Sequence, residues 1–279
     1  MNKKSFTLIE ILVVIVVIGI LSSFILIGMN SITQSANIAK SRAFSDSLRN
    51  SLLANLVSEW KLDGTGTNTT AIDSWGVNNG TLINFNFDTT DGWRDNSQCI
   101  SNNCLQFDGT NDYVNHGTSS NLAITGAITI SVWIKFNLAG TDQSIIGRGR
   151  ALSSSGDYGC FVSRYGSNNR IYFDTYSTTT RDSLNSLIAI ADTNWHFVVA
   201  TWDGTINTNG KKIFIDGSLN NQRTSTISII GQPSYEFRIG RDSASNFPFN
   251  GLIDNGQIYN NVTQSTLIQQ NYFLGLNKL

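Results

Sequence analysis

The chain has 279 residues, and its 19 basic and 20 acidic side chains leave a formal net charge of −1. Charged residues make up only 14% of the sequence and form no basic block, which argues against a nucleic-acid partner. The length accommodates one sizeable domain besides a terminal segment. Abundant Gly, Asn, Thr and Ser with only 2 Pro are typical of short strands joined by tight turns.

An apolar segment follows a short basic leader at the N-terminus. It runs from Phe6 to Met29, which is enough for the ~20 residues that a helix needs to cross a bilayer. Lys3 and Lys4 precede it and are predicted to hold the leader on the cytoplasmic side. Glu10 interrupts the apolar pattern, and a carboxylate at that depth is costly unless a partner neutralises it. A secretory signal peptide would have a shorter apolar part followed by a small-residue cleavage site.

The residues Ser5-Phe6-Thr7-Leu8-Ile9-Glu10 resemble the processing and methylation site of type IV pilins and pseudopilins. The resemblance implies that a prepilin peptidase cuts before Phe6 and methylates the new N-terminus. It also implies that Glu10 pairs with the terminal amine of a neighbouring pilin subunit, because either charge alone is penalised in an apolar bundle. The family usually has Gly at the position of Ser5, and this departure bears on the efficiency of cleavage.

Helical spacing of apolar residues continues beyond Met29, and no Pro interrupts residues 6–56. We therefore expect a leader over residues 1–5 and one pilin-type helix over 6–56. The helix is expected to be transmembrane over about residues 6–29 and amphipathic over about 30–56. A separate domain is expected over residues 57–279.

From about Val57 the apolar pattern changes from helical to alternating, which predicts strands. Asp-Gly and Asn-Gly pairs punctuate the alternating runs, as antiparallel connections prefer. One run is apolar on both faces and predicts a strand that is covered on both sides. Many short strands and little helix indicate a β-sandwich, with a last short helix over residues 263–273. The clearest strands are expected over Ile128–Phe136, Arg170–Tyr176 and Lys211–Asp216, and the run that is apolar on both faces is Trp195–Asp203.

Several segments, in order, resemble the laminin G-like jelly roll of the concanavalin A-like lectins and glucanases. They include Glu59–Asp63, Leu105–Gly109, Asn194–Val198 and Gly251–Asp254, and the resemblance covers nearly all of residues 57–279. The expected fold class is therefore α+β, a long N-terminal membrane or filament helix followed by an antiparallel jelly-roll sandwich. Near the end the family more often has a second Asp and a basic residue, where this chain has Asn255 and Gln257.

The resemblance also implies a structural Ca²⁺ in some members. Carried onto this sequence, the ligands are Asp73, Asn79 and Asp254, with Asp63 as a further candidate. Oxygen ligands from separate loops suit Ca²⁺, which takes six to eight of them. The alternative role of these residues is to cap turns.

Four aromatic residues are candidates for stacking on a sugar, namely Trp133, Trp202, Tyr172 and Tyr176. Each is placed by strand alternation opposite apolar neighbours, so the rings could form a platform on an open sheet. The alternative is that loops cover them, since most Trp side chains are largely buried.

Cys99 and Cys104 are close in sequence and are expected to form a disulfide outside the membrane, whereas Cys160 is expected to be a buried thiol. A glycosidase of this fold would gather two or three carboxylates, usually Glu. The sequence has only three Glu, and no Glu-x-Asp-x-Glu pattern. We therefore expect that the protein is not an enzyme.

Together these features predict a prepilin that is held in the inner or cytoplasmic membrane and then joins an extracellular pilus or pseudopilus. Its sandwich is expected to bind a glycan or another cell-surface ligand and to serve adhesion. Two alternatives stay open. A pseudopilin of a type II secretion-like system would share the helix and need no ligand, and a major structural pilin would polymerise without one.

Overall fold

The computed structural model describes residues 8–19, 55–137, 141–149, 158–162, 168–231, 235–244 and 246–276. The chain divides into two compact units, Met1–Ala54 and Asn55–Leu279. In the first unit, residues 8–19 are helical and exposed. Ser5, Phe6 and most of the expected helix, residues 20–54, lie outside the described residues. In the described part of the chain, no helix is both long and apolar enough to cross a membrane.

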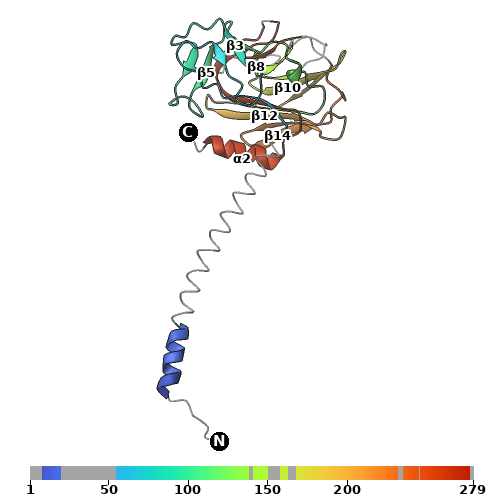
Figure 1. Ribbon diagram of the computed structural model, residues 1–279. Coiled ribbons are helices and arrows are strands. Elements are labelled where there is room, and N and C mark those ends of the chain that lie inside the picture. The colour runs from blue at the N-terminus through green and yellow to red at the C-terminus, as the bar shows by residue number, and fades with distance from the viewer. Residues whose placement is uncertain are drawn as a thin grey trace. The chain divides into compact units, whose positions relative to one another are not determined.

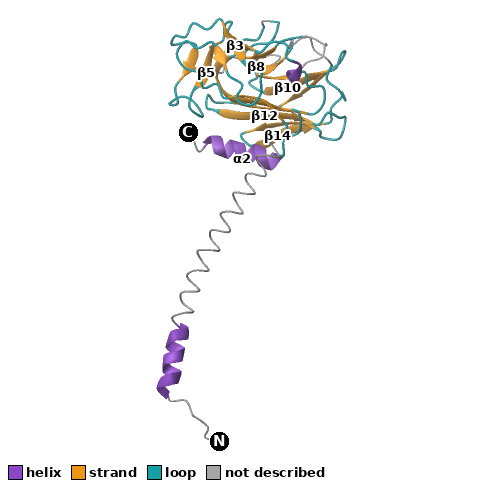
Figure 2. Ribbon diagram, viewed as in Figure 1, coloured by secondary structure: helices purple, strands orange, loops and turns teal. Residues whose placement is uncertain are grey.

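The second unit is a sandwich of two antiparallel sheets (Figure 1 and Figure 2). Its strands are β1 (Leu56–Trp60), β2 (Thr70–Ala71), β3 (Gly80–Ile83), β4 (Gly92–Arg94), β5 (Cys104–Asp108), β6 (Tyr113–Asn115), β7 (Ile128–Phe136), β8 (Gln143–Arg148), β9 (Tyr158–Val162), β10 (Ile171–Tyr176), β11 (Arg181–Asn185), β12 (His196–Trp202), β13 (Lys211–Ile215), β14 (Ser218–Arg223), β15 (Phe237–Ile239) and β16 (Asn250–Tyr259). Two helical segments, η1 (Ser120–Leu122) and α2 (Ser265–Leu276), complete it.

Sheet A has the order β14-β13-β12-β7-β16-β5-β4, with β1 also paired to β16. Sheet B has the order β11-β10-β9-β8-β15-β6-β3-β2. The long strands β7 and β16 pair along most of their length at the centre of sheet A. Because β1, the first strand of the domain, pairs with β16, the last, residues from both ends of the domain meet there.

The alternation in β7 fixes which side chains enter the main core. Ile128, Ile130, Val132, Ile134 and Phe136 all point between the sheets and are buried, as the sequence predicts. Fully burying a side chain of this size contributes ~1.5–3 kcal/mol. The strand expected to be covered on both sides is β12, and this is also confirmed. Side chains on one face of β12 pack in the main core between the sheets, and those on the other face pack in a second apolar cluster on the outer face of sheet A.

The first strand begins earlier than the sequence suggests. Leu56, which the helical spacing assigns to the end of the long helix, lies in β1 and is paired with Tyr259 of β16. The spacing is misleading here because Leu56 and Trp60 also fit the alternating burial of a strand, which is what β1 shows. Pairing with β16 decides between the two patterns.

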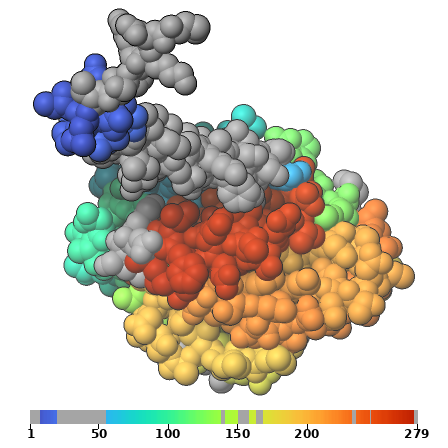
Figure 3. Space-filling model, turned by 90° about the horizontal axis from the view of Figure 1, so that it is seen from below, coloured from blue at the N-terminus to red at the C-terminus, as the bar shows by residue number. Residues whose placement is uncertain are grey.

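Helix α2 covers part of the outer face of sheet A, the face away from sheet B (Figure 2). It confirms the helix expected over residues 263–273. Ile268 packs there with a buried cluster formed by Ile100, Trp133, Phe197, Val199 and Phe214. The C-terminal part of the chain is spread over this side of the molecule in Figure 3.

A disulfide joins Cys99 to Cys104 and closes a short loop beside α2. We call residues 99–104 the disulfide loop. Trp195 donates an indole hydrogen bond of 2.9 Å to the carbonyl of Gln98, next to this loop. Cys160 is a buried free thiol, so the predicted states of all three cysteines are confirmed.

Candidate functional site

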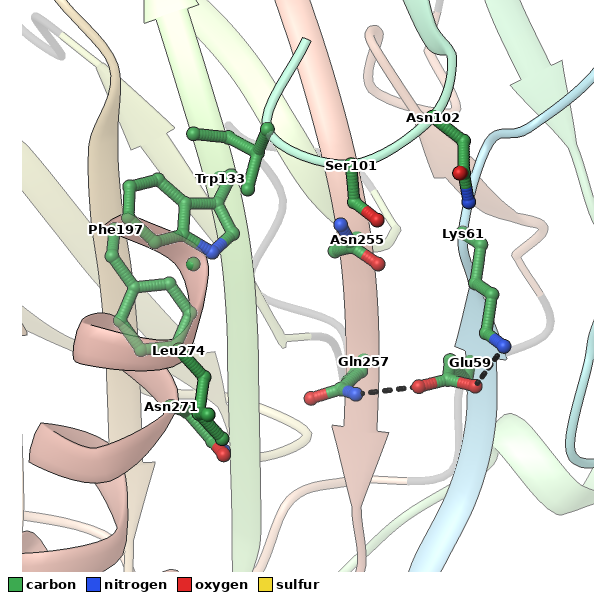
Figure 4. Close-up of a pocket in the computed structure, with 12 residues that line it drawn as sticks. Glu59, Lys61, Ser101, Asn102, Trp133, Phe197, Asn255, Gln257, Asn271 and Leu274 are labelled. Carbon is green, nitrogen blue, oxygen red and sulfur yellow. Dashed lines mark hydrogen bonds and ion pairs between the residues drawn. The ribbon is translucent and has the colours of Figure 1, made fainter. Parts of the chain in front are cut away.

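A cavity of about 310 Å³ opens on the outer face of sheet A. It lies where β1, the disulfide loop, β7, β12, β16 and α2 meet (Figure 4). We call it the outer pocket. It is lined by Glu59, Lys61, Ile100, Ser101, Asn102, Trp133, Phe197, Asn255, Gln257, Asn271, Leu274 and Gly275.

The apolar wall of the outer pocket is built from Trp133 of β7 and Phe197 of β12. These residues are register partners, and their ring centroids are 5.1 Å apart. Gly275 lets α2 approach the wall closely, because a Cβ atom at this position would lie 2.3 Å from the Trp133 ring. Trp133 is only 3% exposed, so the pocket reaches an edge of the indole and not its whole face.

The indole N–H of Trp133 has no hydrogen-bond partner among the described residues. By contrast, the indoles of Trp60, Trp93, Trp195 and Trp202 all donate to backbone carbonyls. Figure 4 shows the Trp133 nitrogen on the side of the ring that faces Asn255 and Gln257. This N–H is therefore available to donate to a ligand acceptor in the outer pocket.

The polar wall is organised around Gln257 of β16. Its amide nitrogen donates to Glu59 Oε1 at 2.8 Å, and its amide oxygen accepts from Ser131 Oγ at 3.1 Å and from the Tyr259 hydroxyl at 2.9 Å. Ser74 Oγ donates to the other Glu59 oxygen at 2.6 Å. These bonds fix both planar groups, so little side-chain entropy is lost when a ligand binds them.

Two further amides face the pocket without intramolecular bonds in the described part of the chain, those of Asn255 and Asn271. Asn255 has φ 48°, in the left-handed region that Asn tolerates better than most residues. It lies in the irregular stretch of β16 between Asp254 and Gln257, where the register with β7 shifts. Such bulges redirect side chains, and here Asn255 lines the pocket beside Ser101 (Figure 4).

Asp254 lies beneath the disulfide loop and is fully buried. Its Oδ2 accepts backbone hydrogen bonds from Ile100 at 3.0 Å and Ser101 at 3.1 Å, and its Oδ1 has no partner in the described residues. Burial, together with the nearby charge of Asp63, raises the pKa of the Asp254 carboxyl to about 7, although the backbone donors act in the opposite direction. Asp254 therefore holds the loop that forms one rim of the outer pocket.

Glu59 is the only carboxylate among the lining residues of the outer pocket. Lys61 Nζ lies 3.9 Å from Glu59 Oε2, and the Lys61 side chain is 51% exposed, so this ion pair contributes little to stability. A glycosidase uses two carboxyl groups across the scissile bond. Amides, one carboxylate, one ammonium group and an indole N–H instead suit hydrogen-bond recognition of a polyhydroxylated ligand.

The four aromatic residues predicted to stack on a sugar do not form one platform. Trp202 is 0% exposed and lies in the main core between the sheets, so this prediction is wrong for Trp202. Trp202 lies on the face of β12 that is turned toward sheet B, whereas Phe197 lies on the outer face. Tyr176 is also buried, and Tyr172 accepts a hydrogen bond from Asn168; both lie in β10 of sheet B. Of the four, only Trp133 lines the outer pocket.

The predicted calcium ligands fall into separate places. Asp73 accepts four backbone hydrogen bonds, from Glu59, Trp75, Gly76 and Asn78, and Asn79 accepts one from the Asp73 backbone. These bonds outweigh burial and lower the pKa of Asp73.

Asp63 accepts from Asn102 and Asn103 and lies near Asp254. Within the described residues, Asp63, Asp73 and Asp254 do not come together as a metal-ligand cluster. Capping therefore accounts for the observed bonds of Asp73 and Asn79.

The outer pocket uses residues that sequence reasoning did not select, chiefly Glu59, Lys61, Asn271 and the pair Asn255 and Gln257. The sequence held one indication of this site. Asn255 and Gln257 replace residues that are more often charged in the resembled family, and both of these amide side chains line the outer pocket. Nothing in the sequence around Asn271 indicated a site, because Asn271 reaches the pocket only through the packing of α2 on the outer face of sheet A.

A sequence model of the concanavalin A-like lectin/glucanase superfamily matches residues 108–269. The chain belongs to this superfamily. A second model, the prokaryotic N-terminal methylation motif, matches residues 1–26, so this superfamily member also carries a type IV pilin-type signal. No curated protein matches the chain.

Solved structures with the same fold include three informative cases. The binding domain of botulinum neurotoxin serotype G is 16% identical with a TM-score of 0.57, and the match covers 79% of this chain and 51% of that one. Domain 4 of AbnA, a GH43 arabinanase from Geobacillus stearothermophilus solved with arabinotriose, is 16% identical with a TM-score of 0.57, covering 77% and 97%.

A sialidase from Trypanosoma rangeli is 15% identical with a TM-score of 0.53, covering 80% of this chain and 33% of the enzyme. The chain thus spans about half of the neurotoxin binding domain and a third of the sialidase. At these identities the likeness shows the fold alone.

Proposed function

We propose that the protein is a type IV pilin-like subunit that displays a glycan-binding sandwich on an extracellular filament. Two features support the proposal. The N-terminal methylation motif covers residues 1–26, and the rest of the chain holds a concanavalin A-like domain with a polar pocket on its outer face. A filament subunit without a ligand would not require such a pocket.

In this proposal the precursor is held in the inner or cytoplasmic membrane by its N-terminal apolar segment. A prepilin peptidase cuts between Ser5 and Phe6 and methylates Phe6. In the filament, Glu10 meets the terminal amine of a neighbouring subunit. The pair sets the axial register because an unpaired charge in a bundle of apolar helices is strongly unfavourable.

The observation that carries the glycan proposal is the set of free hydrogen-bonding groups in the outer pocket. The amides of Asn255 and Asn271 and the indole N–H of Trp133 converge there without intramolecular partners in the described residues. Sugar hydroxyls both donate and accept, and therefore match planar amides. The arabinotriose complex of AbnA domain 4 supports the proposal because it is a sugar-bound domain of the same fold.

A glycan array probed with the full chain in detergent micelles tests this proposal. We expect a restricted set of oligosaccharides to bind, and expect Asn255→Ala with Asn271→Ala to weaken binding at least tenfold. Gln222→Ala, an exposed amide on β14 far along sheet A, is the matched control and should bind as the parent does. A silent array, or binding that the double variant leaves intact, would contradict the proposal.

A further inference from the structure

Three aspartates converge at the edge of sheet A formed by β4 and β5. Asp91 directly precedes β4, Asp108 ends β5, and Asp112 lies in the turn that leads to β6. One carboxylate oxygen from each lies within 4.8 Å of the others. Asp91 is 0% and Asp112 1% exposed, so two of the three are removed from water. This cluster is separate from the outer pocket and from Asp63, Asp73 and Asp254.

The hydrogen bonds at this cluster leave acceptor capacity unused. Asp91 Oδ1 accepts from the backbone N–H groups of Asn86 and Phe87, and Asp91 Oδ2 accepts from the Asn86 backbone and side-chain amides. Asp108 Oδ1 accepts from Thr110 N at 2.7 Å, and no hydrogen bond to Asp108 Oδ2 is formed in the described residues. Asp112 Oδ2 accepts from Asp108 N at 3.0 Å. Asp112 Oδ1 is buried and has no hydrogen-bond partner in the described residues.

No described Lys or Arg forms an ion pair with these three carboxylates. The nearest guanidinium in sequence, Arg94, donates to Gln106 Oε1 and to the backbone carbonyls of Asp91 and Trp93. None of these hydrogen bonds reaches a carboxylate oxygen of the cluster. Three carboxylates cannot all stay ionised at this separation in a poorly hydrated place unless a cation or a proton neutralises part of the charge.

We propose that Asp91, Asp108 and Asp112 bind a Ca²⁺ ion that ties the segment before β4 to the β5–β6 turn. Carboxylate oxygens are the ligands that Ca²⁺ prefers, and backbone carbonyls and water complete its six to eight positions. The ion would hold one end of the β4–β5 hairpin. The disulfide loop closes the other end, because Arg94 pairs with Cys104 in the register of this hairpin.

The competing explanation is a proton on Asp112. Burial, and then the charges of Asp108 and Asp91, raise the pKa of Asp112 to about 7 although the Asp108 backbone N–H lowers it. A proton would therefore neutralise the cluster at pH 6, whereas Ca²⁺ would do so at pH 8. If a proton alone neutralises the cluster, Ca²⁺ should neither bind nor change the Tm at pH 8.

Thermal unfolding of the full chain in detergent, followed by tryptophan fluorescence, tests the site. After EDTA treatment, saturating CaCl₂ at pH 8 should raise the Tm by about 5–10 °C, and the rise should be smaller at pH 6. Titration calorimetry should show one Ca²⁺ per chain, with MgCl₂ much weaker. Asp112→Asn should abolish both signals and, since it removes a buried charge, should unfold in EDTA no earlier than the parent.

Two control variants make the result specific. Asp88→Asn changes an exposed aspartate in the same segment and should keep the full Ca²⁺ response, as should Asp254→Asn beneath the disulfide loop. The proposal is overturned if Ca²⁺ neither binds nor raises the Tm at pH 8, or if Asp112→Asn keeps the response. It is also overturned if Asp254→Asn, and not Asp112→Asn, abolishes the response.

Discussion

Asp254 is a buried carboxyl group whose ionisation opposes folding. Burial raises the pKa of its carboxyl group from an ordinary value of 3.8 to about 7 in the folded protein. The folded state therefore holds the proton more tightly than the unfolded state between about pH 4 and 7. Over that window the stability contributed by this group falls as the pH rises, and above pH 7 the loss is complete.

Asp254→Asn should remove this loss. The amide keeps an oxygen for the N–H groups of Ile100 and Ser101 and places an NH₂ where Oδ1 has no partner. We expect the variant to be more stable than the parent by about 1–3 kcal/mol at pH 8, with little difference at pH 4. Urea unfolding in EDTA at both pH values measures this. Equal stabilities at pH 8 would show that Asp254 is not desolvated as the structure indicates.

At the scale of elements, the contact between α2 and β7 shapes the outer pocket. In an exposed helix, replacing Gly by Ala normally stabilises by ~1 kcal/mol. Gly275 differs because its Cβ would meet the Trp133 ring at 2.3 Å.

We therefore expect Gly275→Ala to destabilise the domain by about 1–3 kcal/mol, the usual range for overpacking, and to weaken glycan binding. Gln270→Ala, at an exposed position of the same helix, is the control and should be neutral. Denaturant midpoints of the two variants provide the comparison. A stabilised Gly275→Ala protein would mean that α2 does not pack on Trp133.

The strands could be predicted from the sequence because alternation is local. The inward face of β7 follows directly from Ile128, Ile130 and Val132. The fates of Trp133 and Trp202 could not be predicted in this way. Both lie on strands of sheet A, but Trp202 points between the sheets and Trp133 points toward α2. Which face is covered, and by what, depends on a helix more than sixty residues away along the chain.

The sites were harder to predict than the fold for the same physical reason. The outer pocket joins Glu59 near the start of the domain to Asn255 and Asn271 near its end. The aspartate cluster brings Asp91 against Asp108 and Asp112 only because β4 pairs with β5. By contrast, Cys99 and Cys104 are close in sequence, and their disulfide was predictable from spacing alone.

At the scale of the whole molecule, the N-terminal motif predicts a processed subunit. The peptidase site requires a small residue before Phe6, so Ser5→Gly should be cut at least as well as the parent. Ser5→Leu should accumulate as the uncut precursor. N-terminal sequencing and intact mass, which detects the methyl group, measure both outcomes. A mature N-terminus at any residue other than Phe6 would contradict the pilin-type assignment.

Assembly is tested separately from processing. Glu10→Ala removes a charge from an apolar helix, so it should insert and be cut normally. It should be depleted from sheared filaments at least tenfold, because the terminal amine of the neighbouring subunit loses its partner. Immunoblots of filaments against whole cells give the ratio. Normal incorporation would mean that another contact sets the register.

The claim that the outer pocket receives a sugar is tested most directly by the tryptophan indole resonances of a fragment beginning at Asn55. All 6 Trp lie in this fragment, which should fold alone because it contains both sheets and the main core. On titration with an oligosaccharide bound on the array, the Trp133 indole N–H should shift strongly. The Trp60 and Trp202 indoles, which donate to Asn78 and Thr205 inside the domain, should stay in place. Saturable binding that leaves the Trp133 resonance unmoved would contradict the account.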